Sequence, residues 1–304
     1  MGKITCAAVV AIGVMFAASS VSAEELWDPH LRAVDEGLAA GAALPSGVYG
    51  VLDNWYGDFD QFNNAGSKTG VKLDVAVEVP ILLWQSPYKI LGADYSAAIA
   101  QPFDYTNVKV PHDAALSANG HWGTYNTLII PAQLAWKLPN DFHVKAGLTV
   151  NVDDASSSPA HPPSGGGVGS GNGYWTLQPD FGVSWMHGGW DISVNAHYDY
   201  NFKDSRTGYT SGQEIAVDYT VMKTIGKWNI GLGAYSENQV SSDTGPGAAG
   251  CVGKGGCKAS NYGVGPMVEY NLGGVIVLAE YNAPISTKND VGGSVYNIRL
   301  VKPF

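Results

Sequence analysis

Residues 174–202, YWTLQPDFGVSWMHGGWDISVNAHYDYNF, form two segments of alternating apolar and polar residues around a His-Gly-Gly turn. In the second segment every other residue from Ile192 to Phe202 is apolar, and the positions between them hold Asp, Ser, Asn and His. A period of two residues places the two sets on opposite faces of a β-sheet. Strands of soluble proteins usually have about 5–6 residues, whereas a strand that crosses a bilayer needs about 9–11. Because the alternation continues for about a dozen residues, we expect a transmembrane β-hairpin here.

Segments of the same character divide the remainder of the chain, and together with the hairpin they predict twelve strands. The predicted strands are residues 47–56, 71–83, 88–103, 122–136, 142–152, the two halves of 174–202, 214–223, 228–239, 262–270, 274–283 and 294–304.

The predicted connections alternate between short and long. The short ones are residues 85–87, 137–141, 187–189, 224–227 and 271–273. The long ones are residues 57–70, 104–121, 153–173, 203–213, 240–261 and 284–293. Such sorting is typical of an up-and-down barrel with short periplasmic turns and long external loops. We therefore expect an all-β fold, a transmembrane antiparallel β-barrel of about 12 strands in the outer membrane of a Gram-negative bacterium.

Tryptophans favour the same topology, because eight of the nine lie at predicted strand ends. Trp55, Trp122 and Trp175 adjoin long loops, and five others adjoin short turns. Aromatic side chains anchor membrane proteins at the two lipid–water interfaces. This distribution therefore predicts two aromatic girdles around the barrel.

The N-terminal region differs from the predicted barrel, residues 47–304. Residues 1–23 have the features of a secretory signal peptide: Lys3, an apolar run and a Val-Ser-Ala end. Residues 24–46 show no strand pattern, and they either plug the lumen or lie in the periplasm.

Charged residues make up only 14% of the chain, against about 25% in soluble proteins. The net charge of −10 excludes nucleic acid as an expected partner.

Three cysteines occur, and Cys6 belongs to the predicted signal peptide. Cys251 and Cys257 lie close together in a Gly-rich loop, and an even number of cysteines in an oxidising compartment predicts a disulfide. A metal site is the alternative. Two thiols without a neighbouring His or carboxylate do not complete a structural zinc site, so we expect no metal there.

No set of residues in the sequence predicts catalysis. The seven histidines are scattered, and no serine lies within a nucleophile motif. The Gly-rich loops do not follow the strand–loop–helix pattern of phosphate-binding sites. We therefore expect neither enzyme activity nor a cofactor.

The polar faces of the predicted strands indicate which residues line the lumen, and most of the charged ones are acidic. The lumen-lining candidates are Lys72, Asp74, Glu78, Asp94, His143, Lys145, Asp180, His197, Asp199, Glu214, Asp218, Glu269, Glu280 and Arg299. Charged groups inside a barrel need water or partners. Two interpretations follow: a water-filled acidic pore that favours cations, or an interior in which the carboxylates are paired and close around a plug.

Four segments resemble one family of outer-membrane proteins. They are residues 37–49 (GLAAGAALPSGVY), 127–136 (TLIIPAQLAW), 173–185 (GYWTLQPDFGVSW) and 263–270 (GVGPMVEY). In order and spacing they are similar to the meta-pathway phenol-degradation outer-membrane proteins, distant relatives of the long-chain fatty-acid outer-membrane transporters. The last strand, which ends in Phe304, is similar to the signal that the barrel-assembly machinery recognises in such barrels.

The resemblance implies passage of small hydrophobic or aromatic compounds across the outer membrane, with lipid and these solutes as partners. Such a transporter would have an apolar pocket near its outer end, for which Trp122, Tyr125, Tyr174 and Trp175 are candidates. An acidic lumen fits this function poorly unless a plug and a lateral opening exist, as in the fatty-acid transporters. A water-filled, cation-preferring general porin is the alternative.

Overall fold

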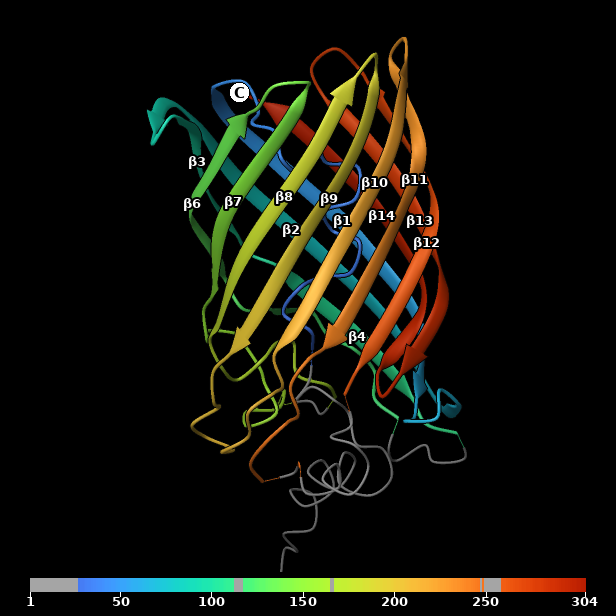
Figure 1. Cartoon of the computed structure of the whole chain (residues 1–304). Helices are drawn as coiled ribbons and strands as arrows, with labels where there is room; N and C mark the ends of the chain where they lie inside the picture. The colour runs from blue at the N-terminus through green and yellow to red at the C-terminus, as the bar shows by residue number, and fades with distance from the viewer. Residues whose placement is uncertain (1–26, 112–116, 165–166, 247, 249–257) are drawn as a thin grey trace, which may run out of the picture.

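The described part of the chain forms a closed antiparallel β-barrel. The computed structural model describes residues 27–111, 117–164, 167–246, 248 and 258–304 (Figure 1). Its strands are β1 (Gly47–Phe62), β2 (Lys68–Ile90), β3 (Ala93–Ala100), β4 (Phe103–Lys109), β5 (Gly123–Thr124), β6 (Leu128–Lys137), β7 (Phe142–Asn151), β8 (Thr176–His187), β9 (Trp190–Asn201), β10 (Glu214–Ile225), β11 (Trp228–Gln239), β12 (Ser260–Asn271), β13 (Ile276–Lys288) and β14 (Val291–Pro303). Because β1 pairs with both β2 and β14, the sheet closes on itself.

The predicted twelve-strand barrel is confirmed, with two of its strands interrupted. β3 and β4 both pair with β2 and together form the third strand of the barrel. β5 and β6 together form the fourth, because β5 pairs with β4 and β6 pairs with β3. The third strand is interrupted before Phe103, where Pro102 has no N–H to donate to the ladder. The fourth strand is interrupted beside it, between Thr124 and Leu128.

Three predicted connections are wrong. The predicted loop 57–70 is mostly strand, because β1 ends at Phe62 and β2 begins at Lys68. Residues 85–87 do not turn the chain but form an irregularity within β2, and the turn between β2 and β3 is Leu91–Gly92. The predicted loop 284–293 is almost entirely strand, because β13 and β14 are joined by Asn289 and Asp290 alone. A bulge accommodates Pro87 without ending the strand, and the pairing of β13 with β14 continues beyond the apolar region that marked these strands in the sequence.

The outer surface of the barrel is apolar over β8–β11. On β8–β11 the outward side chains include Phe181, Ile192, Val194, Tyr219 and Leu232, each more than a third exposed. Their inward neighbours are polar and buried, so the alternation in residues 174–202 has the predicted orientation. Within the residues that the structure describes, no helix has the length and hydrophobicity needed to span a membrane.

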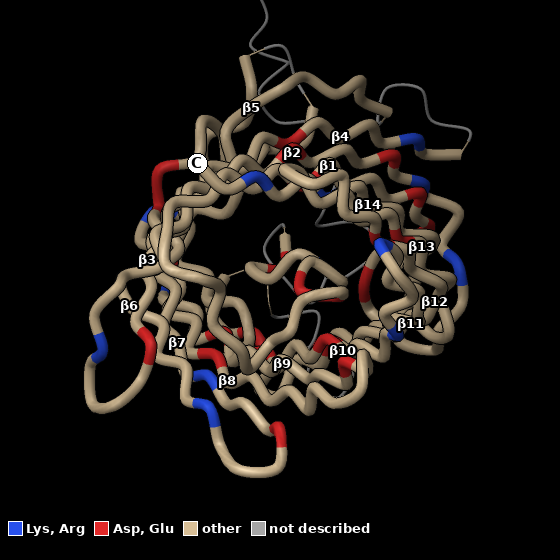
Figure 2. The backbone as a smooth tube through the Cα atoms, turned by 90° about the horizontal axis from the view of Figure 1, so that it is seen from above, with Lys and Arg blue, Asp and Glu red and all other residues tan. Residues whose placement is uncertain are grey.

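Residues 27–46 run through the interior of the barrel. Figure 2, viewed along the barrel, shows this segment inside the ring of strands, nearer to β9 and β10 than to β2. At the long-loop end, Trp27 Nε1 donates a hydrogen bond of 3.0 Å to the Gly169 carbonyl. At the short-turn end, Ser46 Oγ donates one of 3.3 Å to the Ser86 carbonyl. We call residues 27–46 the lumen segment.

Candidate functional site

The lumen segment is held to one side of the barrel by Arg32, which is almost fully buried. The Arg32 guanidinium forms ion pairs with Glu237 of β11, with Asp28 at 2.5 Å and with Asp290 at 2.6 Å. It also donates a hydrogen bond of 2.6 Å to the Val291 carbonyl. One buried cation thus neutralises part of a group of three carboxylates and joins the segment to the wall.

A second arginine, which belongs to the wall, donates hydrogen bonds to backbone carbonyls of the lumen segment. Arg299 of β14 is buried, and its Nε lies 2.7 Å from Asp53 Oδ1. Its Nη1 donates a hydrogen bond of 2.8 Å to the Glu36 carbonyl, and its Nη2 donates one to the Val34 carbonyl. Arg299 therefore supplies donors to carbonyls that form no helix or sheet.

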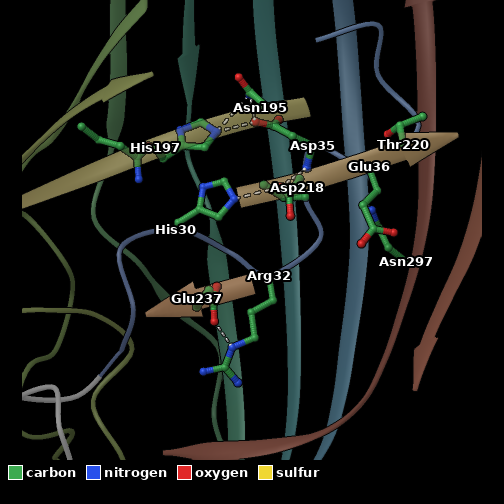
Figure 3. Close-up of polar contacts among 12 residues, drawn as sticks. His30, Arg32, Asp35, Glu36, Asn195, His197, Asp218, Thr220, Glu237 and Asn297 are labelled. Carbon is green, nitrogen blue, oxygen red and sulfur yellow. Dashed lines mark hydrogen bonds and ion pairs between the residues drawn. The ribbon is translucent and has the colours of Figure 1, made fainter. Parts of the chain in front are cut away.

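Two histidines, His30 of the segment and His197 of β9, lie face to face (Figure 3). His30 Nε2 is 3.0 Å from Asp218 Oδ2 of β10, and His197 Nε2 of β9 is 2.8 Å from Asp35 Oδ2. The imidazole ring centroids are 4.2 Å apart. Burial by itself would lower the pKa of His30, but the hydrogen bond and negative charge of Asp218 raise it to about 10.

Glu36 is fully buried beside β13, where Asn282 Nδ2 donates to Glu36 Oε2 at 2.9 Å. Burial and the negative charges of Glu280 and Asp218 raise the pKa of Glu36 to about 10. Glu36 is therefore protonated at neutral pH, so it adds a hydrogen-bonding group to the lumen without adding a charge.

Small residues allow the segment to lie directly on the backbone of the wall. A Cβ added to Gly41 would lie 2.3 Å from the His143 carbonyl oxygen. A Cβ added to Gly182 of β8 would lie 2.3 Å from the Ala40 carbonyl oxygen. The Gly/Ala-rich composition of residues 37–47 is thus explained by close backbone approach, for which larger side chains leave no room.

The other side of the lumen is apolar. On β2, Val75, Val77 and Val79 point inward and are buried. With Trp55 and Phe59 of β1 they line a cavity of about 790 Å³ between the wall and the lumen segment. The lumen is therefore divided: β7–β14 hold the segment through polar contacts, and β1–β6 present a mainly apolar surface to the cavity.

The prediction that Lys72, Asp74 and Glu78 line the lumen is wrong. They alternate with the inward valines of β2 and lie on the outward face. Asp74 pairs there with the exposed Lys109 of β4 at 2.8 Å. The error has a physical reason: the sequence shows which residues share a face, and we assigned the polar face to a lumen that is apolar at this position.

The other candidates fall into three groups. Asp94 lies at the β2–β3 turn, paired with Lys89 at 2.7 Å. His143, Lys145 and Glu269 are partly buried. The structure places the remaining candidates buried on the inward face: Asp180, His197, Asp199, Glu214, Asp218, Glu280 and Arg299.

Of the aromatic pocket candidates, only Tyr125 lines the cavity, and its hydroxyl donates to the Asp28 carbonyl at 3.3 Å. Trp122 and Trp175 are 55% and 48% exposed, and Tyr174 is buried but does not line the cavity. This prediction is therefore wrong for three of its four residues.

The aromatic residues that line the cavity include three that the prediction missed, Trp27, Trp55 and Phe59. Trp55 was expected at the membrane interface, but it points inward and donates to the Arg32 carbonyl at 3.0 Å. Both faces of β1 mix polar and aromatic residues, so the sequence carries no signal for its orientation.

The disulfide predicted between Cys251 and Cys257, and the predicted signal peptide, lie outside the described residues.

Comparison with known proteins agrees with this architecture. The outer membrane channel of Pseudomonas putida F1 superimposes with a TM-score of 0.73 at 14% identity, covering 89% of this chain and 100% of that one. The β domain of the Bordetella autotransporter BrkA gives 0.48 at 11% identity, with coverages of 85% and 100%. The CymD monoaromatic hydrocarbon channel gives 0.40 at 11% identity, with coverages of 86% and 89%. At these identities the first likeness shows the fold alone, and the other two carry no argument.

No curated protein matches the chain. A family model described as "Putative MetA-pathway of phenol degradation" matches residues 57–300, most of the chain. The resemblance inferred from the four sequence segments is thereby confirmed. The chain is an outer-membrane β-barrel that belongs to this phenol-degradation family.

Proposed function

We propose that the barrel passes small hydrophobic compounds, aromatic ones foremost, across the outer membrane through the apolar side of its lumen. The protein acts in transport and not in catalysis. The observation that carries the proposal is the inward face of β2, where Val75, Val77 and Val79 replace the polar lining of a water-filled pore. Ligand sites for apolar molecules are concave and mainly apolar, with a few polar groups. The family to which the chain belongs is associated by its description with phenol degradation.

The divided lumen also accounts for three of the acidic residues of the interior, whereas others, such as Asp180, Asp191 and Glu269, line the cavity. Asp218, Asp35 and Glu237 pair with His30, His197 and Arg32. These carboxylates hold the lumen segment, so they do not supply the free negative charge of a cation-selective pore.

The wall beside the cavity supplies a lateral exit toward the membrane. The interruptions of the third and fourth strands adjoin each other, and Gln101 bridges them: its Nε2 donates to the carbonyls of Pro102 at 3.2 Å and Tyr125 at 2.9 Å. Thr127 Oγ1 donates to Gln101 Oε1 at 2.7 Å. We call residues 101–102 and 125–127 the seam. Side-chain hydrogen bonds add there to the backbone bond of 2.9 Å from the Tyr125 N–H to the Pro102 carbonyl, and Pro102, Tyr125 and Leu128 line the cavity.

The test uses a substitution that narrows the cavity without changing the charge of its lining. Val77→Trp places a large side chain in the cavity, and we expect the initial rate of uptake of phenol or toluene by cells to fall severalfold. Ala76→Trp is the matched control, since residue 76 lies on the outward face of the same strand. Uptake is measured with radiolabelled compound at equal surface expression of each variant.

Equal uptake in Val77→Trp, Ala76→Trp and the unchanged protein would contradict the proposal. A fall in uptake of a hydrophilic sugar equal to that of toluene would favour the general porin instead.

A further inference from the structure

A compact group of nitrogen and oxygen atoms lies at the junction of the lumen segment and the wall (Figure 3). It contains His30 and Asp35 of the segment, His197 of β9 and Asp218 of β10. One ring nitrogen of each histidine and one Asp35 oxygen all lie within 4.8 Å of one another. Asp218 Oδ2 lies 3.0 Å from His30 Nε2 and accepts a hydrogen bond of 3.1 Å from the Asp35 N–H.

Three of the four side chains are buried. His30, His197 and Asp218 are 5%, 8% and 3% exposed, and the Asp35 side chain is 21% exposed beside the cavity. The carboxylates of Asp35, Asp218 and Asp199 interact with the two imidazoles, and Lys145 of β7 also faces Asp35. Buried carboxylates need compensating positive charge. Either protons on the two imidazoles or a single divalent cation could provide it.

Three further atoms of β9 next to this group have no hydrogen-bond partner within the described residues. They are His197 Nδ1, Asn195 Oδ1 and Asp199 Oδ2, and all three are buried. The β9 side chains at this junction therefore have more ligand-type atoms than the protein itself satisfies, although buried polar groups are normally paired.

We propose that this group binds one divalent transition-metal ion of the zinc type, with His30, Asp35 and His197 as its ligands and Asp218 as the hydrogen-bond partner that orients His30. Imidazole nitrogens and carboxylate oxygens are the mixed set that Zn²⁺ accepts in tetrahedral sites. Mg²⁺ and Ca²⁺ prefer oxygen ligands alone. A ring nitrogen that binds a metal carries no proton, so the ion takes the place of the hydrogen bond between His197 and Asp35. Two ligands from the segment and one from the wall make the ion a link between them.

The first experiment measures binding to the unchanged protein. Full-length protein without a histidine tag, in detergent, is titrated with ZnCl₂ in a calorimeter, and we expect one Zn²⁺ per chain. With CoCl₂ we expect the intense visible absorption of tetrahedral Co²⁺, which Zn²⁺ abolishes and Mg²⁺ does not. Both measurements are independent of any variant's ability to fold.

The second experiment locates the site. Loss of outer partners of a metal ligand weakens binding about 10–100-fold, so loss of two ligands in H30N/H197N should weaken Zn²⁺ binding by more than about 100-fold. H187N is the matched control, because His187 is exposed and pairs with Asp141 at 2.8 Å, outside the group. The proposal is overturned if the unchanged protein binds neither Zn²⁺ nor Co²⁺, or if H30N/H197N binds them as tightly as H187N. The group would then consist of two histidine–carboxylate pairs, His30 with Asp218 and His197 with Asp35, without a metal ion.

Discussion

Among the described residues of the lumen segment, Arg32 forms the largest number of ion pairs. Its guanidinium contacts three carboxylates and one carbonyl, and these acceptors come from the segment itself, from β11 and from the residues around the β13–β14 turn. A buried arginine in such a group contributes less by its net attraction than by preventing the carboxylates from being left unpaired.

Arg32→Met should therefore release the lumen segment. Removing one partner of a buried ion pair costs about 3–5 kcal/mol, and here Asp28, Glu237 and Asp290 all lose their common partner. We expect faster hydrogen exchange of the amides of residues 28–42, measured by mass spectrometry, while the amides of β8–β11 remain protected.

Arg206→Met is the control for this prediction. Arg206 pairs with Asp153 at 2.6 Å and Asp204 at 3.2 Å among the long loops, away from the segment. Equal exchange of residues 28–42 in the two variants would show that Arg32 does not fix the segment.

At the scale of elements, the seam is the weak part of the wall. The third and fourth strands are broken side by side, and the Gln101 side chain adds hydrogen bonds beside the backbone bond from the Tyr125 N–H to the Pro102 carbonyl. Other pairs such as β8–β9 run without an interruption of either strand. Openings in a β-barrel require backbone groups to lose their partners, so we expect the wall to open most easily where both strands are interrupted.

Gln101→Ala should loosen the seam. Each lost hydrogen bond costs about 1 kcal/mol, or roughly fivefold in an equilibrium. We expect the amides of Gln101 and Tyr125 to exchange faster by at least that factor, together with a changed rate of hydrophobic uptake.

Gln213→Ala is the matched control, since the Gln213 carboxamide bridges to the backbone of Asn201 at 3.0 and 3.3 Å, away from the cavity. If Gln101→Ala alters neither exchange nor uptake more than Gln213→Ala does, the seam is not the place where the wall opens.

The same scale shows what the sequence could and could not predict. Alternation of period two located β8–β11 and their outward faces, because one face meets lipid and the other meets polar groups. The same period in β2 predicted a strand but the wrong orientation, because its outward face carries the charges. Alternation identifies two faces, and only the neighbours in space decide which one points inward.

The candidate site was less predictable than the fold. Inward carboxylates such as Asp218 follow from strand periodicity, but the partner of Asp218, His30, lies in the lumen segment, far away in the sequence. No period links His30 to Asp218 or Arg32 to Glu237, so these pairs appear only when the segment is placed inside the barrel.

For the whole molecule, the central feature is a lumen divided lengthwise. The lumen segment occupies the polar side from the long-loop end at Trp27 to the short-turn end at Ser46, and the cavity of about 790 Å³ lies between it and the apolar side. An acidic interior and passage of hydrophobic compounds are therefore compatible, because β1 and β2 give the solutes an apolar surface in a cavity that Asp180, Asp191 and Glu269 also line.

The most direct test of this division is single-channel conductance in a planar bilayer, measured for the intact mature protein and for a variant without residues 24–46. The intact protein should show little steady ion current, because the polar side is filled and the open side is apolar. The variant should show steady, cation-preferring currents, because the carboxylates that now pair with the segment would line a wet pore. Large, steady, cation-selective currents from the intact protein would contradict the account.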